Sequence, residues 1–198
     1  MASAPSSVSP PHLPDTAREM VKILVAGPFG VGKTTLIDSV SEITPLHTEE
    51  PLTEASAHVD DLAGVREKST TTVAIDFGRI SLPGGIVLYL FGTPGQERFR
   101  ELWEDISYGA LGALVLVDSR RVGDSFGVLG LVEDSGLPYA VAINTFPDSP
   151  RHHTHERLRR ALDLEADTPM VTCDARDPNS SVDALLALVD HLVVRETR

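Results

Sequence analysis

A glycine-rich segment between two apolar elements constrains this chain more than any other feature. Residues 27–34 read GPFGVGKT and satisfy the pattern G-x-x-x-x-G-K-[ST]. The β-branched run of residues 21–26 precedes the segment, and residues 34–40, which have helical character, follow it. In this order of strand, loop and helix, backbone N–H groups and the positive end of a helix surround a phosphate. The pattern therefore predicts an α/β domain built around a phosphate-binding loop.

Each residue type in this loop contributes to phosphate chemistry. Glycines let the backbone turn its N–H groups inward, Lys33 is expected to reach the terminal phosphates, and the Thr34 hydroxyl is expected to bind Mg²⁺. The alternative is a chance glycine turn, and the flanking strand and helix argue against it. The residues predicted to contact a nucleotide here are Gly27, Phe29, Gly30, Val31, Gly32, Lys33, Thr34 and Thr35.

Strand-like and helix-like segments alternate along the rest of the chain. A hairpin is predicted from residues 71–82 and 86–91, with its turn at Pro83-Gly84-Gly85. Further strands are predicted at 113–117, 139–144 and 169–173, and helices at 97–107, 121–135, 152–163 and 180–194. This order predicts a doubly wound, mostly parallel six-stranded sheet with one antiparallel edge hairpin. Ligands bind such sheets at the carboxyl ends of the strands.

One domain is expected, because 198 residues suffice for a single well-buried α/β core. Residues 1–17 are rich in Pro, Ser and Ala and are predicted to be a flexible tail, which leaves residues 18–198 as the domain. The polar, acidic residues 41–69 are predicted to form a long mobile connection. A mobile connection beside a phosphate loop suggests a switch.

The charge balance argues against several function classes. With a formal net charge of −12, the chain has no broad basic surface for nucleic acid or anionic lipid, so a protein partner is expected. The single cysteine, Cys173, rules out an intramolecular disulfide and a cysteine-based zinc site. His152, His153 and His155 are expected to be solvated, because no cysteine completes a metal site with them. Signal-peptide, membrane-span and lipidation patterns are not found, so a cytoplasmic protein without a direct membrane anchor is expected.

Two further segments resemble the switches of Ras-like GTPases. In residues 90–99, LFGTPGQERF, Gly95 matches the glycine that donates its N–H to the γ-phosphate, and Gln96 matches the glutamine that orients the attacking water. Gly92 departs from that family, in which most members carry an aspartate that holds Mg²⁺ through water. Thr72 aligns with the threonine that completes Mg²⁺ coordination in the triphosphate state. The alternatives are a solvated loop amide at Gln96 and plain strand propensity at Thr72.

Residues 144–148, NTFPD, resemble the guanine-reading Asn-Lys-x-Asp motif only in part. Asn144 matches the asparagine, but the lysine is absent and Asp148 arrives one residue late. An aspartate carboxylate there would accept two hydrogen bonds from guanine, and the alternative is that both residues serve turn geometry. The segment after the last strand falls where relatives place Ser-Ala-Lys, whose backbone touches the guanine oxygen. This adds three residues to the predicted nucleotide contacts: Cys173, Asp174 and Ala175.

Together these motifs resemble the bacterial conservon GTP-binding proteins (the CvnD group), which are cousins of the gliding-motility GTPase MglA. The resemblance covers residues 20–195 and implies a Ras-like P-loop NTPase that binds GTP or GDP with Mg²⁺. It implies catalytic roles for Gln96, Lys33 and Thr72, with Thr34 and Thr72 as metal ligands. It also implies slow GTP hydrolysis by the chain alone, regulation by a roadblock-fold protein and a sensor kinase-like protein nearby. Recruitment to a membrane would then pass through those partners.

Two rival hypotheses remain open at this point. An ATP-dependent phosphotransferase is one, because the loop does not read the base. A nucleotide-binding scaffold without turnover is the other, motivated by Gly92 and the incomplete base motif. Without an aspartate at 92, Mg²⁺ is expected to bind weakly in the GDP state, unless a carboxylate of residues 49–61 takes over its task.

Overall fold

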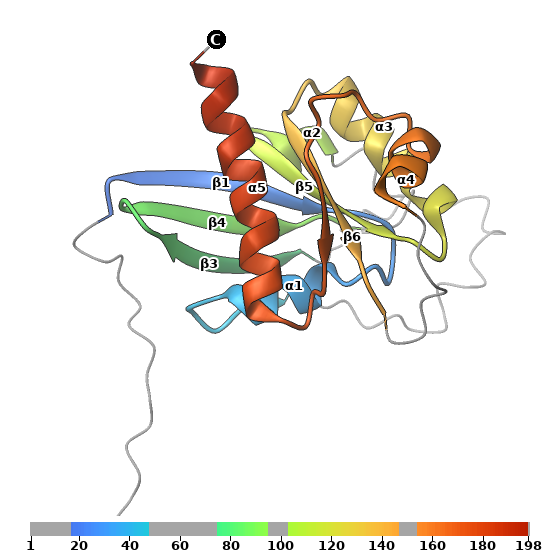
Figure 1. The fold of residues 1–198 in the computed structure, drawn as a ribbon. Helices are drawn as coiled ribbons and strands as arrows, with labels where there is room; N and C mark the ends of the chain where they lie inside the picture. Colours follow the sequence, from blue (N-terminus) through green and yellow to red (C-terminus); the bar gives the residue numbers. More distant parts are fainter. Residues whose placement is uncertain (1–16, 48–74, 95–102, 147–153, 198) are drawn as a thin grey trace, which may run out of the picture.

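The computed structural model describes residues 17–47, 75–94, 103–146 and 154–197 (Figure 1). The predicted tail, apart from residue 17, and residues 48–69 of the predicted mobile connection lie outside the described residues.

Seven strands form one sheet in the order β2-β3-β4-β1-β5-β6-β7. β1 pairs in parallel with β4 and β5, and β6 and β7 continue the parallel part, whereas β2 and β3 run antiparallel to their neighbours. The strands are β1 (Glu19–Ala26), β2 (Leu46–His47), β3 (Asp76–Leu82), β4 (Ile86–Gly92), β5 (Gly112–Asp118), β6 (Tyr139–Asn144) and β7 (Met170–Cys173). The predicted doubly wound sheet with an antiparallel edge is confirmed.

The prediction of six strands was wrong by one. The additional strand, β2, has two residues, of which Leu46 pairs with Phe77 and His47 pairs with Asp76. A strand of this length leaves no periodic pattern in the sequence, so residues 41–69 read as connection only. The short strand places His47 beside the carboxylate of Asp76.

Helices cover both faces of the sheet, with α1 and α5 on one face and α2, α3 and α4 on the other (Figure 1). The helices are α1 (Lys33–Val40), α2 (Trp103–Ser107), the 3-10 turn η3 (Val122–Ser125), α3 (Phe126–Asp134), α4 (His155–Ala161) and α5 (Pro178–Glu196). The helices predicted at 34–40, 121–135, 152–163 and 180–194 are found with shifted ends, and the described part of the helix predicted at 97–107 is α2. Residues 97–102 and 152–153 of these predicted helices lie outside the described residues. Within the described part of the chain, no helix is long and apolar enough to span a membrane.

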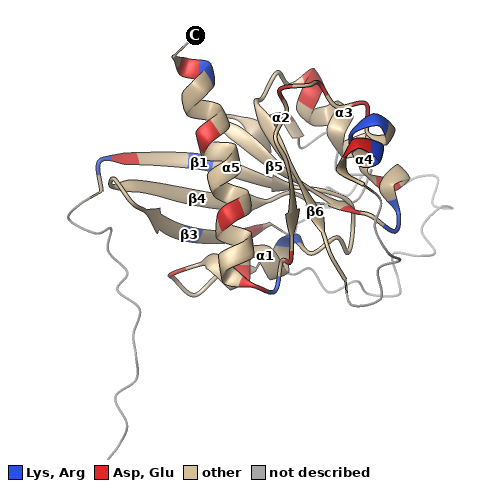
Figure 2. Ribbon diagram, in the orientation of Figure 1, with Lys and Arg blue, Asp and Glu red and all other residues tan. Residues whose placement is uncertain are grey.

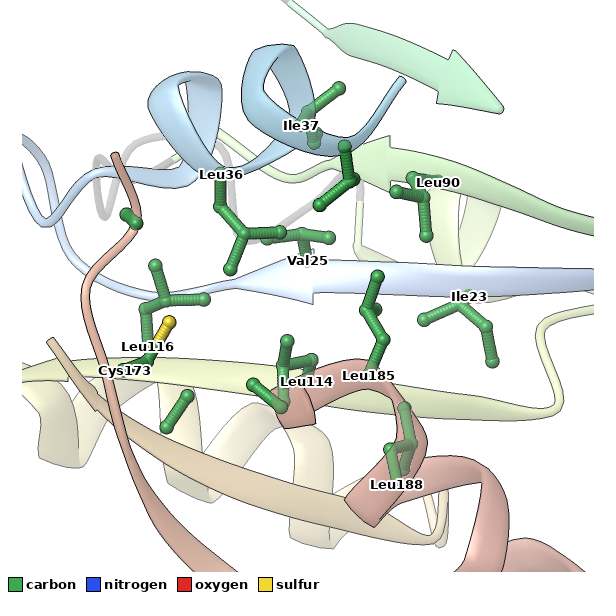
Figure 3. Packing of buried hydrophobic residues seen from close by; sticks show 14 of the residues in the cluster. Ile23, Val25, Leu36, Ile37, Leu90, Leu114, Leu116, Cys173, Leu185 and Leu188 are labelled. Atoms are coloured by element: carbon green, nitrogen blue, oxygen red, sulfur yellow. The ribbon is translucent and has the colours of Figure 1, made fainter. Parts of the chain in front are cut away.

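The apolar runs of the central strands are buried on both sides because helices cover both faces. Side chains alternate along a strand, so Ile23 and Val25 of β1 join one cluster and Leu24 joins the cluster on the opposite face. Figure 3 shows the first cluster, in which Leu36 of α1 and Leu185 of α5 pack against the strands. This packing aligns the carboxyl ends of β1, β5 and β6 at one edge, where the glycine loop begins.

Charged positions are spread over the described elements, and two of them, Arg79 and Asp118, are buried. In Figure 2 the Lys and Arg positions of the described ribbon are interspersed with Asp and Glu, and acidic positions recur along α5. This distribution agrees with the formal net charge of −12.

Candidate functional site

The glycine loop of residues 27–32 joins β1 to α1. Gly27 has φ 145° and Gly32 has φ 106°, a region that L side chains rarely adopt. A Cβ at Gly27 would lie 2.6 Å from the carbonyl oxygen of Leu116, and one at Gly32 would lie 2.7 Å from Nδ2 of Asn144. These two glycines are therefore required by backbone conformation and by the close approach of β5 and β6.

The N-terminus of α1 opens directly onto this loop. Its N-cap residue is Gly32, and its first turn carries no acidic residue. The first N–H groups of a helix have no carbonyl partner within the helix, and the helix dipole adds partial positive charge there. This end of α1 therefore favours an anion, in agreement with the predicted phosphate site.

The ammonium group of Lys33 contacts the first two residues of the loop. Its Nζ donates to the carbonyl oxygens of Gly27 at 2.8 Å and Pro28 at 2.9 Å. Burial lowers the pKa of Lys33 to about 8, and the nearby Asp76 carboxylate offsets part of that fall. A desolvated ammonium that contacts neutral carbonyls is stabilised by an anion, so phosphate chemistry fits this position.

Beside Lys33, four side chains form a continuous polar row, the Thr34–Asp76–His47–Asp38 row. The Thr34 hydroxyl donates to Oδ2 of Asp76 at 2.6 Å, and Nδ1 of His47 lies 2.9 Å from Oδ1 of the same carboxylate. Nε2 of His47 lies 3.3 Å from Oδ1 of Asp38. The motif predicted Thr34 alone; Asp38 lies outside the motif on the same helix, and Asp76 and His47 come from β3 and β2.

Gly92 lies directly opposite Asp76 in the β3–β4 pair. A Cβ at position 92 would lie 2.9 Å from Cβ of Asp76 and 3.0 Å from its Oδ2. Gly92 is not among the residues with positive φ in the described part of the chain. The side chain of Asp76, rather than an unusual backbone conformation, accounts for a glycine at this position.

Asn144 connects the glycine loop to the segment after β7. Its buried amide Nδ2 donates to the carbonyl oxygen of Val31 at 2.8 Å, and its Oδ1 accepts from the N–H of Ala175 at 3.0 Å. The residue was predicted as a contact of the base, and the structure places it between two loops that both adjoin the phosphate site. Both of its amide atoms already have protein partners here.

The other two residues predicted here, Cys173 at the end of β7 and Asp174 directly after it, differ in exposure. The Cys173 side chain is buried in the core, and burial raises the pKa of its thiol. Asp174 pairs with Arg176 through Nε at 2.8 Å and Nη2 at 2.7 Å, and these hydrogen bonds lower the pKa of its carboxyl. The Cys173 thiol therefore faces the core, and a contact from this segment to a ligand would come from backbone or from Asp174.

A further group at the same edge was not predicted. Asp118, buried at the end of β5, accepts from Nε of Arg120 at 3.0 Å and from Nη2 at 2.8 Å, and the Arg120 guanidinium lies 3.8 Å from the centre of the Phe146 ring. Burial raises the pKa of the Asp118 carboxyl, but the Arg120 hydrogen bonds more than offset this and hold it below its usual range. Because Phe146 follows Asn144 by two residues, this cation–aromatic pair flanks the side predicted to read the base.

Several predicted residues cannot be placed relative to this site. Outside the described residues lie Thr72, Gly95, Gln96, Asp148, His152 and His153. His155 is exposed, and its Nε2 lies 2.9 Å from the Thr172 hydroxyl. Among the residues that the structure describes, no group of three His, Cys, Asp or Glu side chains is arranged to hold a metal ion. Among the described residues, the Thr34 hydroxyl beside the Asp76 carboxylate is therefore the candidate contact for a cation at the loop.

Comparisons with known proteins found a matching family model and a related protein. The model of a family described as "Conserved hypothetical ATP binding protein" matches residues 25–195. The chain is 30% identical over 129 residues to the uncharacterized protein MJ1339 of Methanocaldococcus jannaschii, covering 64% of this chain and 71% of that protein.

Solved structures share the fold at low sequence identity. The G domain of the T. maritima FeoB iron transporter has a TM-score of 0.61 and 17% identity, covering 87% of this chain and 98% of that one. The FeoB cytosolic domain of L. pneumophila has a TM-score of 0.60 and 16% identity, covering 85% and 70%. The T. maritima cytosolic domain in its GMPPNP form has a TM-score of 0.63 and 17% identity, covering 87% and 64%. The chain therefore shares its fold with the FeoB G domain.

Proposed function

Because the chain belongs to the family described as conserved hypothetical ATP binding proteins, we propose that its glycine loop binds the phosphates of a purine nucleotide and that the chain works as a GTP-dependent switch. The observation that carries this proposal is the position of Lys33. Its partly desolvated ammonium contacts the carbonyl oxygens of Gly27 and Pro28, and the N-terminus of α1, capped by Gly32, adjoins the same loop. Two sources of positive charge thus converge on one loop, which is the arrangement that a polyphosphate requires.

Guanine is the base we propose, although the family description names ATP. The support is the G-domain fold, together with the likeness of residues 90–99 to a GTPase switch. Solved neighbours with this fold include forms described with GMPPNP and GDP. Asn144 would act here by holding the loop and the Ala175 segment together around the nucleotide. ATP remains the alternative base, favoured by the description of the family.

The site fits Mg²⁺ through its oxygen atoms, which are the ligands that this ion prefers. Thr34 would supply a hydroxyl ligand, and Thr72 would add a second one when a triphosphate is bound. Bound Mg²⁺ would neutralise charge on the phosphate oxygens. The chain's own residues would then hold the triphosphate: Lys33 would bind its β- and γ-phosphates, and Gln96 would orient the attacking water.

The switch itself is proposed to respond to a partner protein. The acidic surface disfavours nucleic acid and supports a protein partner. A roadblock-fold regulator and a sensor kinase-like protein are the partners that the resemblance implies. In this proposal the chain acts in the cytoplasm, and its partners recruit it to the membrane.

Single-turnover hydrolysis of labelled GTP, with and without a roadblock-fold partner, tests this function. Wild-type protein should convert bound GTP to GDP and phosphate. Gln96→Leu should lower the rate by roughly 10-fold or more while changing nucleotide affinity by less than about twofold, because glutamine orients water rather than binding the phosphates. Lys33→Ala should lose binding by at least about 2 kcal/mol, since a charge-assisted contact is removed.

Lys22→Ala is the matched control, because the Nζ of Lys22 donates to the carbonyl oxygen of Tyr108, away from the glycine loop. Equal turnover by wild type and Gln96→Leu with the partner present would contradict the role of Gln96. GTP that stays bound without turnover under every condition would favour the scaffold.

A further inference from the structure

Resting on the proposed Mg²⁺-nucleotide function, we propose that Asp76, at the start of β3, is the carboxylate that orients the Mg²⁺ ligands, in place of an aspartate at Gly92 of β4.

The register of the edge hairpin places Asp76 where such a carboxylate is needed. Asp76 and Gly92 face each other directly across the antiparallel pair. Directly opposed residues in such a pair project to the same face of the sheet, and here a Cβ at position 92 would lie only 2.9 Å from Cβ of Asp76. A carboxylate on either strand therefore reaches the same volume beside α1.

The contact with Thr34 shows what this carboxylate does. The Thr34 hydroxyl has one proton to donate and two lone pairs to offer. Its proton goes to Oδ2 of Asp76 at 2.6 Å, which leaves the lone pairs free for a cation. Asp76 thus presents the Thr34 oxygen as a metal ligand, and the same carboxylate is available to accept hydrogen bonds from metal-bound water.

The other oxygen of Asp76 is held in place by β2. Nδ1 of His47 lies 2.9 Å from Oδ1, and His47 in turn contacts Asp38 of α1 at 3.3 Å. This support fixes the orientation of the carboxylate, as partners of metal-site carboxylates commonly do. Figure 1 shows that β3 and α1, which carry Asp76 and Asp38, lie side by side, as their contact across Gly78 and Ile37 also shows.

The same geometry explains why residue 92 is glycine. A Cβ there would lie 2.9 Å from Cβ of Asp76, closer than real Cβ contacts. A second aspartate would also place two carboxylates in one volume, where like charges repel. One carboxylate fits, and in this chain it comes from β3. The expected weakness of Mg²⁺ binding in the GDP state is therefore revised to a binding of ordinary strength that depends on Asp76.

Mn²⁺ titration of the GDP-loaded full chain, followed by electron paramagnetic resonance, tests this assignment. Asp76→Asn keeps the size of the side chain and should weaken Mn²⁺ binding by about 10- to 100-fold, the usual effect of losing an outer partner of a metal site. GDP affinity measured in EDTA should not be weakened, a result that a merely structural role of Asp76 would not give. The control Asp38→Asn, at the far end of the row, should change Mn²⁺ affinity by only a few-fold.

Moving the carboxylate from position 76 to position 92 gives a test that can restore Mn²⁺ binding as well as weaken it. Gly92→Asp alone should not tighten Mn²⁺ binding, because Asp76 occupies the space. Asp76→Gly should weaken binding, and the double variant Asp76→Gly/Gly92→Asp should restore it to within a few-fold of wild type.

Three results would overturn the inference. They are unchanged Mn²⁺ affinity in both Asp76 variants, a gain from Gly92→Asp alone, and a double variant as weak as Asp76→Gly. If the wild-type chain binds GDP and any one of these results is obtained, only the role of Asp76 is contradicted. A wild-type chain that binds no guanine nucleotide, with or without metal, contradicts the proposed function and this inference with it.

Discussion

At Lys33, burial lowers the pKa of the ammonium group to about 8. Phosphate oxygens favour the charged ammonium, so a bound nucleotide should raise this pKa again. Between pH 8 and 10.5 the unfolded chain binds more protons at this lysine than the folded chain does. The stability of the nucleotide-free protein should therefore gain from this group as pH rises through that window.

Nucleotide binding at alkaline pH should accordingly take up a proton. At pH 8.5, calorimetry of GDP binding in buffers of different ionisation enthalpy should show that Lys33 takes up about 0.7 proton, and the difference in uptake between wild type and Lys33→Arg should fall to nearly zero at pH 6.5. Lys33→Arg should abolish the uptake, because a guanidinium stays charged throughout this range. An uptake that is absent at pH 8.5, or that persists in Lys33→Arg, would contradict the contact between Lys33 and phosphate.

Residue roles near Lys33 were predictable where one short motif contains them. Lys33 and Thr34 follow from the loop pattern, because strand, glycines and helix are contiguous. Asp76 lies 42 residues from Thr34 in the chain, and no local pattern joins them. The signal that could have found it is the turn at Pro83-Gly84-Gly85, because a hairpin closed by Leu82 and Ile86 sets Asp76 opposite Gly92.

Among the elements, β6 ends in Asn144, whose side chain bonds both the glycine loop and the loop after β7. Replacing it with alanine leaves the carbonyl of Val31 and the N–H of Ala175 without their partner. Buried unpaired groups of this kind cost about 1 to 3 kcal/mol each. Asn144→Ala should therefore lower the free energy of unfolding by about 3 kcal/mol in urea denaturation and weaken GDP binding as well.

The matched control for this prediction is Asn179→Ala. Asn179 is exposed at the start of α5, and only its backbone N–H is used, by the Asp177 cap. The control should stay within about 0.5 kcal/mol of wild type. If Asn144→Ala also stays within about 0.5 kcal/mol of wild type, the Asn144 hydrogen bonds to the two loops do not stabilise the fold.

At the same scale, strand β6 was predicted with its observed bounds, and β2 was missed. The run YAVAIN is apolar because helices cover both faces of the sheet, so its length is visible in the sequence. β2 has two exposed residues, and its pairing with β3 depends on a contact between segments distant in the chain. The starts of α4 and α5 also differ from the predicted ones. Thr154 caps α4, and Asp177 caps α5 with Pro178 as the first helical residue.

For the whole molecule, the phosphate half and the base half of the proposed nucleotide site were not equally predictable. The phosphate half is one contiguous motif at the end of β1, where the strand order reverses between β4 and β5. The base half is drawn from the ends of β6 and β7, and Asn144 there bonds the protein itself. A doubly wound fold of this type supports nucleotides of either base, so base choice depends on side chains rather than on fold.

Competition for the nucleotide site is therefore the measurement that tests the central claim most directly. Purified full-length chain is loaded with fluorescent GDP in Mg²⁺, and unlabelled GTP, GDP and ATP are titrated against it, with Lys33→Ala as the control that should not load. GTP and GDP should displace the probe at concentrations at least about 100-fold lower than ATP, because a site that hydrogen-bonds guanine leaves polar groups unpaired with adenine. Displacement by ATP as effective as that by GTP would contradict the guanine-nucleotide switch.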